Sequence, residues 1–344
     1  MLPAENFLAW TRANEWGGTP EYSEYLSNGV KLDVWDSGVL CVTPEHTNQR
    51  DLVLSCAVHG DETAPIEICD QLIEAIRSQE LLPRCRILFL IANPAAINVN
   101  RRFVEENMNR LFNGGHSRGE GLVNKERIRA KKIEAYVAKF FAQAPSDEPR
   151  ERLHYDMHTA IRDSQHEKFA VYPFTDGAPY KKRQLQLLRA MGVPVILLND
   201  GPTTTFSYHS VKHHGADAFT VELGKVKPFG ENDMQSFAAT IHTLKALITE
   251  DEPDLAPFNE NDFEIFQVLR SINRTVEDFE LNFSDALANF TPFAKGELLA
   301  RDGATEYRAE YEGEAVIFPN AKVALGQRAL LTVITISANQ LELV

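Results

Sequence analysis

The chain has 344 residues, a hydrophobic content of 44%, a charged content of 24% and a net charge of -14 at pH 7. These fractions are ordinary for a globular protein, and the length predicts one large α/β domain followed by a smaller domain. The acidic balance argues against nucleic acid as a partner, because phosphate binding needs a basic face.

No apolar stretch reaches the length of a membrane span, and residues 1–6 lack the basic region of a signal peptide. The cysteines show no CxxC spacing, and Cys56 and Cys85 adjoin apolar runs, which predicts buried thiols. We therefore expect a cytoplasmic protein without membrane contact. A homo-oligomer is compatible with the sequence, which leaves the oligomeric state open.

The first predicted elements are a helix over residues 6–13 and strands near 30–35 and 38–43, and they carry no evident chemistry. A buried strand over Leu52–Leu54 and a helix over Thr63–Arg77 follow, with His59 and Glu62 between them. Ligands bind at such strand-to-helix edges in α/β sheets, and a histidine and a carboxylate three residues apart can bind one zinc ion. The alternative is an ordinary helix start, with Asp61 as cap and Glu62 in solvent.

A catalytic zinc ion needs a third protein ligand. The most suitable residue is His158, because the run Leu153–Thr159 is a second strand-like segment that ends in a histidine. His59, Glu62 and His158 would leave the fourth coordination position for water.

A polar segment over residues 100–112 follows the predicted strand 86–92. Its residues Arg102, Asn109 and Arg110 could grip a carboxylate, because guanidinium groups bind carboxylates through two hydrogen bonds. The alternative is a surface loop whose arginines pair with Glu105 and Glu106.

The next predicted elements are helices over 124–143, 180–191 and 232–249, strands over 168–172, 194–198 and 219–224, and a loop over 201–214. Glu222 interrupts the apolar strand 219–224. It either points outward from an edge strand or acts as a general acid and base with a raised pKa.

An acidic, proline-containing segment over residues 250–254 predicts a boundary between domains 1–250 and 251–344. Short alternating segments then predict a small all-β domain. Its strands are expected over residues 265–272, 275–281, 294–300, 315–319 and 330–336.

Four motifs in this order resemble the succinylglutamate desuccinylase/aspartoacylase family of zinc amidohydrolases, which are related to zinc carboxypeptidases. The resemblance covers about residues 50 to 230 and rests on HGDE (59–62), RF…NMNR (102–110), DMHT (156–159) and ELG (222–224). It implies an α/β fold with a zinc-carboxypeptidase-like mixed sheet flanked by helices. The motif NMNR stands where aspartoacylases have DLNR, and this difference makes the chain more similar to the desuccinylases of arginine catabolism.

The resemblance implies zinc-dependent hydrolysis of N-succinyl-L-glutamate to L-glutamate and succinate. One Zn2+ per chain would be held by His59, Glu62 and His158. By the same resemblance, Glu222 would transfer the proton, Arg102 would stabilise the oxyanion, and Asn109 and Arg110 would bind a substrate carboxylate.

Two alternatives stay open: an aspartoacylase-like or carboxypeptidase-like hydrolase of another N-acyl amino acid or peptide, and a non-catalytic zinc-stabilised binding module. The partner expected for the enzyme is a small anionic acylated amino acid. Because N-succinylglutamate has three carboxylates, further cations are needed, and Arg162, Lys168 and Lys225 are candidates by their closeness in sequence to His158 or Glu222.

The remaining histidines have no spacing that completes a metal site, and we expect them in loops and on the surface; they are His46, His116, His154, His166, His209, His213, His214 and His242. His154 would lie about 13 Å from His158 along an extended strand, too far to share an ion. His213 and His214 would point apart if their segment is extended.

Overall fold

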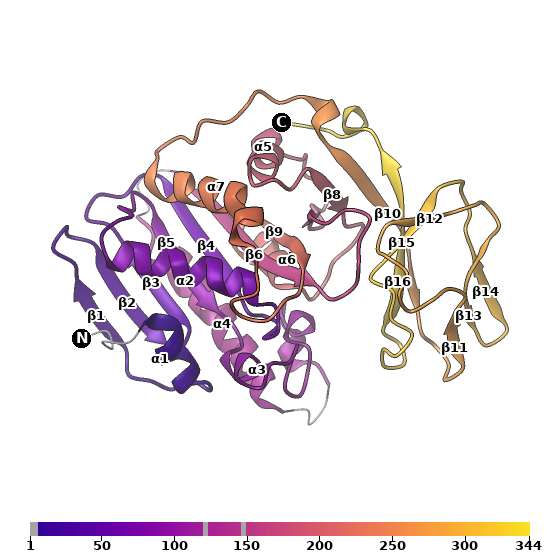
Figure 1. The fold of residues 1–344 in the computed structure, drawn as a ribbon, viewed down its shortest axis with the longest axis horizontal. Helices are drawn as coiled ribbons and strands as arrows, with labels where there is room; N and C mark the ends of the chain where they lie inside the picture. The colour runs from indigo at the N-terminus through magenta and orange to yellow at the C-terminus, as the bar shows by residue number, and fades with distance from the viewer. Residues whose placement is uncertain (1–5, 120–122, 146–148) are drawn as a thin grey trace.

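A large mixed sheet organises the computed structural model, which describes residues 6–119, 123–145 and 149–344 (Figure 1). The helices are α1 (Phe7–Ala13), α2 (Thr63–Arg77), α3 (Pro94–Asn98), α4 (Lys125–Ala142), α5 (Lys182–Ala190), α6 (Phe206–His214) and α7 (Ala238–Thr249). Among the described residues, no helix combines the length and the apolar character needed to cross a membrane.

The strands of the first 250 residues supply most of this sheet. They are β1 (Tyr22–Tyr25), β2 (Lys31–Asp36), β3 (Val39–Thr43), β4 (Arg50–Cys56), β5 (Arg86–Ile91), β6 (Glu151–Ala160), β7 (Phe169–Tyr172), β8 (Val195–Leu198) and β9 (Asp217–Lys225). Strands β5, β4, β6 and β9 are neighbours in that order and run parallel, whereas β1, β2 and β3 extend the sheet in antiparallel fashion. The predicted mixed sheet flanked by helices is therefore confirmed.

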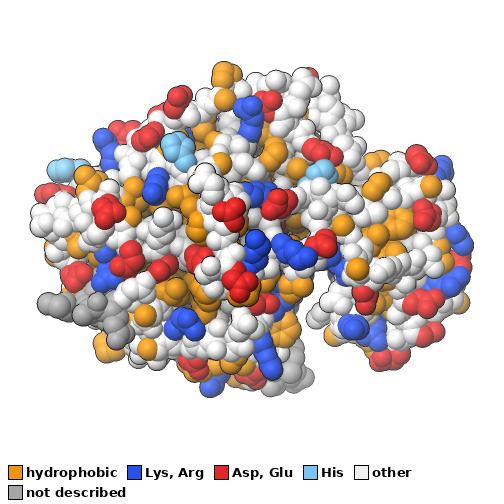
Figure 2. Space-filling view, viewed as in Figure 1, with side chains coloured by type: hydrophobic (Ala, Val, Ile, Leu, Met, Phe, Trp, Pro, Cys, Tyr) orange, Lys and Arg blue, Asp and Glu red, His pale blue; other side chains and the backbone are white. Residues whose placement is uncertain are grey.

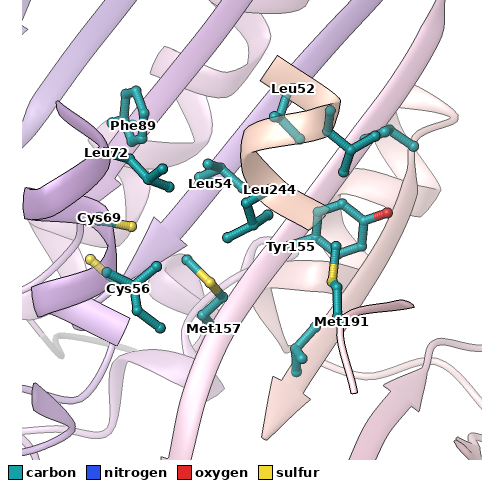
Figure 3. Packing of buried hydrophobic residues seen from close by; sticks show 14 of the residues in the cluster. Leu52, Leu54, Cys56, Cys69, Leu72, Phe89, Tyr155, Met157, Met191 and Leu244 are labelled. Atoms are coloured by element: carbon teal, nitrogen blue, oxygen red, sulfur yellow. The ribbon is translucent and has the colours of Figure 1, made fainter. Parts of the chain in front are cut away.

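Side chains alternate between the two faces of the central strands, and each face is covered by helices. Leu52 and Leu54 of β4 pack in one cluster with apolar residues of α2, α5 and α7, whereas Val53 packs with residues of α4 on the other face. Figure 3 shows the first cluster, in which Leu72 of α2 and Leu244 of α7 lie over the sheet. Burial on both faces explains why these strands read as continuous apolar runs.

The same alternation sorts the residues of β6 by chemistry. Leu153, Tyr155 and Met157 join the apolar cluster beneath α2, so the alternate residues of β6 face the opposite side. That set consists of His154, Asp156 and His158, and it is almost completely buried. The sheet thus has an apolar face and, at the ends of its central strands, a polar face.

The C-terminal residues form the small β domain that the sequence predicts. Its strands are β10 (Glu264–Asn273), β11 (Phe279–Leu281), β12 (Thr291–Phe293), β13 (Leu298–Asp302), β14 (Thr305–Arg308), β15 (Glu314–Ile317) and β16 (Arg328–Ile336). Strand β10 pairs in parallel with β8 and antiparallel with β16, while β11, β13 and β14 form a separate three-stranded sheet. The main sheet therefore continues past residue 250, and the division into 1–250 and 251–344 stays a prediction.

The predicted loop over 201–214 is wrong in its second half, which forms α6. Thr205 has an extended backbone and precedes the first turn, and Gly215 ends the helix with a left-handed φ of 60°. The threonines before the helix and the histidines within it gave no helical pattern, and its first residue, Phe206, stacks on Phe112. The predicted helix 232–249 begins as a 3-10 turn over Met234–Phe237 before α7.

Replacing Leu54 with alanine should lower the free energy of unfolding by about 2–5 kcal/mol, because the fully buried side chain would leave a cavity under α2. Urea unfolding measures the change. Leu82→Ala is the matched control, since Leu82 is 55% exposed and should lose far less. Equal losses for both variants would contradict this assignment of the core.

Candidate metal centre

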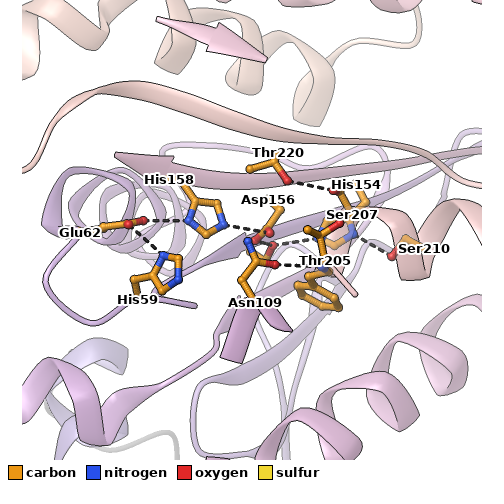
Figure 4. Close-up of polar contacts among 12 residues, drawn as sticks. His59, Glu62, Asn109, His154, Asp156, His158, Thr205, Ser207, Ser210 and Thr220 are labelled. Carbon is orange, nitrogen blue, oxygen red and sulfur yellow. Dashed lines mark hydrogen bonds and ion pairs between the residues drawn. The ribbon is translucent and has the colours of Figure 1, made fainter. Parts of the chain in front are cut away.

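The three predicted metal ligands lie together at the carboxyl end of the central strands. His59 and Glu62 lie between β4 and α2, and His158 lies near the end of β6. His59 Nδ1 is 2.9 Å from Glu62 Oε1, and His158 Nδ1 is 2.8 Å from Glu62 Oε2. One ligand atom from each residue lies within 4.8 Å of the others. Figure 4 shows both imidazole rings turned toward the Glu62 carboxylate. Glu62 is therefore not in solvent, and the alternative of an ordinary helix start is wrong.

The outer nitrogen of each ring is held by an oxygen acceptor. His158 Nε2 lies 3.0 Å from Asp156 Oδ2, and His59 Nε2 lies 2.9 Å from Asn107 Oδ1. Asn107 Oδ1 also accepts a hydrogen bond from the backbone N–H of Asn109, which fixes the orientation of the amide. Both rings therefore donate from Nε2, and both direct Nδ1 toward Glu62.

This arrangement places an electron pair of His59 opposite an oxygen of Glu62. Burial and the positive charge of Arg102 lower the pKa of His59 to about 4, so its ring is neutral at pH 7 and its Nδ1 lone pair faces a carboxylate oxygen. Burial opposes a charge on His158, but Asp156 and Glu62 outweigh burial and raise the pKa of this ring. A cation between two imidazole nitrogens and a carboxylate would remove the repulsion at His59. This donor set suits zinc.

A buried hydrogen-bond network fixes Asp156 from behind. Ser55 Oγ donates to Asp156 Oδ1 at 2.6 Å and lies 2.8 Å from His154 Nε2. His154 Nδ1 lies 2.8 Å from Ser210 Oγ of α6. Since Ser55 has one hydroxyl proton, His154 donates from Nε2 and accepts from Ser210, and burial lowers the pKa of its ring to about 4. The predicted surface role of His154 is therefore wrong: it is a neutral ring inside the sheet.

Arg102 contacts the metal ligands directly. Its Nη1 atom donates to Glu62 Oε1 at 2.8 Å, and its carbonyl accepts from the Gly60 N–H. The Arg102 side chain is 35% exposed, so solvent reaches part of its guanidinium group. The predicted alternative, in which the arginines pair with Glu105 and Glu106, is wrong, because Glu106 pairs with Arg127.

Glu126 of α4 holds the loop that carries Arg102. This fully buried carboxylate accepts hydrogen bonds from the backbone N–H groups of Val104, Glu105 and Glu106 and from Asn93 Nδ2. Three amide dipoles and one side-chain amide compensate its charge, so the loop has a fixed path across the metal group.

Asn109 and Arg110 follow on the same segment. Asn109 is buried, and its Oδ1 atom accepts from the backbone N–H of Phe206 at 3.1 Å, which leaves its NH2 group for other partners. Arg110 donates from Nη1 to the Asn109 carbonyl. Desolvation and the charges of Arg328 and Arg102 lower the pKa of Arg110 to about 9.

Glu222 lies beside His158 in the neighbouring strand. The two residues are directly paired in the register of β6 and β9, and β9 is an interior strand. The Glu222 side chain is buried, and its Oε2 atom has no hydrogen-bond partner among the described residues. Burial raises the pKa of Glu222 to about 7, although the charge of His158 acts in the opposite direction. Glu222 therefore does not point outward from an edge strand.

The additional cations that the sequence offered are engaged elsewhere. Arg162 donates to the carbonyls of Asp285, Leu287 and Pro319. Lys168 donates to the Ser236 carbonyl, and Lys225 pairs with Asp163. Their contacts secure loops and do not reach the metal group.

Backbone geometry brings His59 to its position. Ala57 has a left-handed φ of 57°, so the chain turns sharply after β4. A Cβ atom on Gly60 would lie 2.2 Å from the carbonyl carbon of Ala96 in α3, so only glycine allows this approach. Neither requirement is visible as a spacing pattern in the sequence.

Three histidines of α6 also depart from the prediction. His209 is buried, and His213 and His214 lie on helical turns around it and not on an extended segment. His209 Nδ1 lies 3.4 Å from Glu134 Oε1, and His116 Nε2 lies 3.2 Å from Glu134 Oε2. Within the described ranges, the only group with metal-ligand geometry is His59, Glu62 and His158.

The sequence reading assigned no role to Asp156, Asn107 or Glu126. Asp156 had a detectable signal, because residues two apart on a strand share a face and a carboxylate commonly supports a zinc-binding histidine. Asn107 and Glu126 act through contacts within loops, which no periodic pattern in the sequence predicts.

Comparison with known proteins gives the family. Residues 48–248 match the model of the succinylglutamate desuccinylase/aspartoacylase catalytic domain, and residues 261–336 match the AstE/AspA barrel-sandwich hybrid domain. The chain belongs to the succinylglutamate desuccinylase/aspartoacylase family.

Two relatives within the family are similar over nearly their full lengths. A succinylglutamate desuccinylase of Idiomarina loihiensis is 59% identical over 98% of this chain and 98% of its own. The crystal structure of the succinylglutamate desuccinylase from Vibrio cholerae superposes with a TM-score of 0.87 at 34% identity, covering 97% of this chain and 96% of that chain. The family fold expected from the motifs is thus confirmed.

Replacing Gly60 with alanine should weaken zinc binding by at least about tenfold, because the new methyl group would push His59 and Glu62 away from α3. Titration with zinc followed by calorimetry measures the affinity. Gly201→Ala is the control, since a Cβ atom there meets nothing within 4 Å. Unchanged zinc affinity in both variants would show that the close approach is unimportant.

In metal-free protein, stability should fall as pH rises from about 5 to 8. In the unfolded chain the pKa of Glu222 is 4.5, whereas burial in the folded protein raises it to about 7. The folded protein therefore keeps this proton at pH values where the unfolded chain has lost it. Glu222→Gln has no such proton and should be more stable than the parent by roughly 3 kcal/mol above pH 8.

Urea unfolding with a chelator at several pH values tests this expectation. Glu126→Gln is the matched control, because that carboxylate accepts three backbone hydrogen bonds and its loss should destabilise the protein. A Glu222→Gln variant that follows the pH dependence of the parent would contradict the raised pKa.

Proposed function

We propose that this chain is a zinc-dependent amidohydrolase that converts N-succinyl-L-glutamate to L-glutamate and succinate, a reaction of arginine catabolism. The names of the relatives support the substrate, and their similarity spans nearly the whole chain. The observation that carries the chemistry is the position of Glu222, a buried carboxylate with a free oxygen, beside three convergent metal-ligand atoms.

In this proposal, His59 Nδ1, His158 Nδ1 and the Glu62 carboxylate hold one Zn2+ per chain. When bound, zinc supplies a Lewis acid that makes water more acidic and polarises a carbonyl group. Asp156 and Asn107 keep the Nε2 proton on each ring, so that the Nδ1 lone pairs stay available.

Glu222 is the proposed general base and acid. Its raised pKa suits removal of a proton from water near neutral pH and return of that proton to the departing α-amine of glutamate. No described residue forms a hydrogen bond with Oε2, so this oxygen is available to the reacting water.

Arg102, Asn109 and Arg110 are the proposed substrate-binding residues. Among the described residues, the Arg102 guanidinium donates only to Glu62, and its other N–H groups could stabilise the negative charge that develops on the amide oxygen. Arg110, together with the NH2 group of Asn109, would hold a substrate carboxylate. The proposed partner is accordingly a small anionic acylated amino acid.

A cytoplasmic location is part of the same proposal. All four cysteines, Cys41, Cys56, Cys69 and Cys85, are free and buried, which suits a reducing compartment.

Zinc content and succinate release from purified protein test the proposal. The parent should bind one zinc ion and lose activity to a chelator, and zinc should restore it. Glu222→Gln should keep the metal but lose roughly 100- to 10,000-fold in kcat. His158→Gln should lose the metal, whereas His242→Gln, at an exposed histidine of α7, should keep both metal and activity.

A substrate panel separates this proposal from its relatives. Succinate release from N-succinylglutamate should far exceed hydrolysis of N-acetylaspartate or a dipeptide. Full activity after removal of all metal would refute the zinc site, and full activity of Glu222→Gln would refute the proposed base.

A further inference from the structure

The hydroxyl group of Thr159 is buried and has no hydrogen-bond partner. Thr159 follows His158 directly in β6, and only 1% of its surface is exposed. Its Oγ1 atom forms no hydrogen bond with any described residue. An unpaired hydroxyl inside a protein lowers stability, so folds rarely keep one without a ligand or a function for it. The position of this hydroxyl beside the candidate metal centre indicates where that function lies.

The backbone of Thr159 already contacts the Glu62 carboxylate. The pairing of β4 with β6 ends at Ser55 and Asp156, so the last residues of β6 extend past the end of β4. On the other side of β6, the register with β9 shifts around Thr159. The strand is therefore irregular at this point, and the Thr159 N–H donates to Glu62 Oε2 at 3.2 Å.

Glu62 Oε2 has a second contact that a bound metal ion would remove. His158 Nδ1 lies 2.8 Å from the same oxygen. An imidazole nitrogen binds a metal ion through its electron pair, and it cannot donate a hydrogen bond from the same position at the same time. Of the two contacts to Oε2, only the Thr159 N–H then remains.

The two oxygens of Glu62 differ in this respect. Oε1 accepts from the Arg102 guanidinium at 2.8 Å, and this charged donor does not compete for a metal ion. Besides His158, Oε2 has no charged donor among the described residues. Thr159 carries an unused hydroxyl on the residue that already contacts Oε2. Rotation about its Cα–Cβ bond turns Oγ1 while the N–H stays in place.

We propose that Thr159 is a positioning residue for Glu62, whose Oε2 atom it holds through both its N–H and its hydroxyl when the centre carries a metal ion. This inference rests on the zinc site of the proposed function. The unpaired hydroxyl lowers the stability of the metal-free protein, and in return it favours the metal-bound state. Thr159 thus links metal affinity to stability with opposite signs.

Calorimetric titration with zinc tests the first half of the proposal. Thr159→Val keeps the shape of the side chain but lacks the hydroxyl, and should weaken zinc binding by roughly tenfold. Thr159→Ser keeps the hydroxyl and should stay within about twofold of the parent affinity.

Urea unfolding in the presence of a chelator tests the second half. Thr159→Val should raise the urea midpoint of the metal-free protein, because no unpaired hydroxyl is left in the interior. A residue that only supports the fold would give the opposite sign, since its replacement lowers the midpoint.

Thr332→Val is the matched control. Thr332 is fully buried, and its Oγ1 atom also lacks a partner among the described residues. It belongs to β16, which β9, β7, β8 and β10 separate from β6 in the main sheet. In the space-filling view, the C-terminal domain forms the lobe on the right, set off from the main body by an indentation (Figure 2). Thr332→Val should raise the midpoint in the same way and leave zinc affinity unchanged.

Three results would overturn the role of Thr159. They are parent-like zinc affinity in Thr159→Val, an equal loss of affinity in Thr332→Val, and weaker zinc binding together with a lower midpoint of metal-free Thr159→Val.

The titration needs no substrate, so this inference and the proposed function fail separately. A parent protein that binds zinc but releases no succinate refutes the proposed substrate, and the comparison of the variants still decides about Thr159. A parent protein that binds no zinc overturns both.

Discussion

The constraint on which this site depends is the fixed proton position on two buried imidazole rings. Asp156 and Asn107 each accept from an Nε2 atom, so both Nδ1 atoms face the Glu62 carboxylate. At His59, whose ring is neutral at pH 7, the buried Nδ1 lone pair and the carboxylate repel each other unless a cation lies between them. The outer acceptors therefore determine the chemistry of the centre as much as the three inner residues do.

The sheet makes this burial of polar groups feasible. One face of β6 packs against apolar residues beneath α2, and the other holds a continuous hydrogen-bond network that runs from Ser210 through His154 and Ser55 to Asp156. Because nearly every donor in that network has an acceptor, the cost of desolvation is largely compensated. Glu222 Oε2 on the neighbouring strand and Thr159 Oγ1 beside His158 are buried atoms without a hydrogen-bond partner among the described residues.

The C-terminal strands are continuous with this sheet. Strand β10 pairs with β8, and Arg162 and Asn289 bond the new strands to the segment after His158. The domain therefore has a fixed position beside the metal centre.

Local patterns in the sequence were sufficient to predict the parallel strands and α2. They also predicted that His59, Glu62 and His158 lie together, because strand and helix periodicity place these residues at one edge of a sheet. Tertiary structure alone decided the rest. The burial of His154, the start of α6 at Phe206 and the contact of Gly60 with α3 all arise between segments far apart in the chain. Periodicity reports only which face of its own element a residue occupies; which partner that face meets depends on how the whole chain packs.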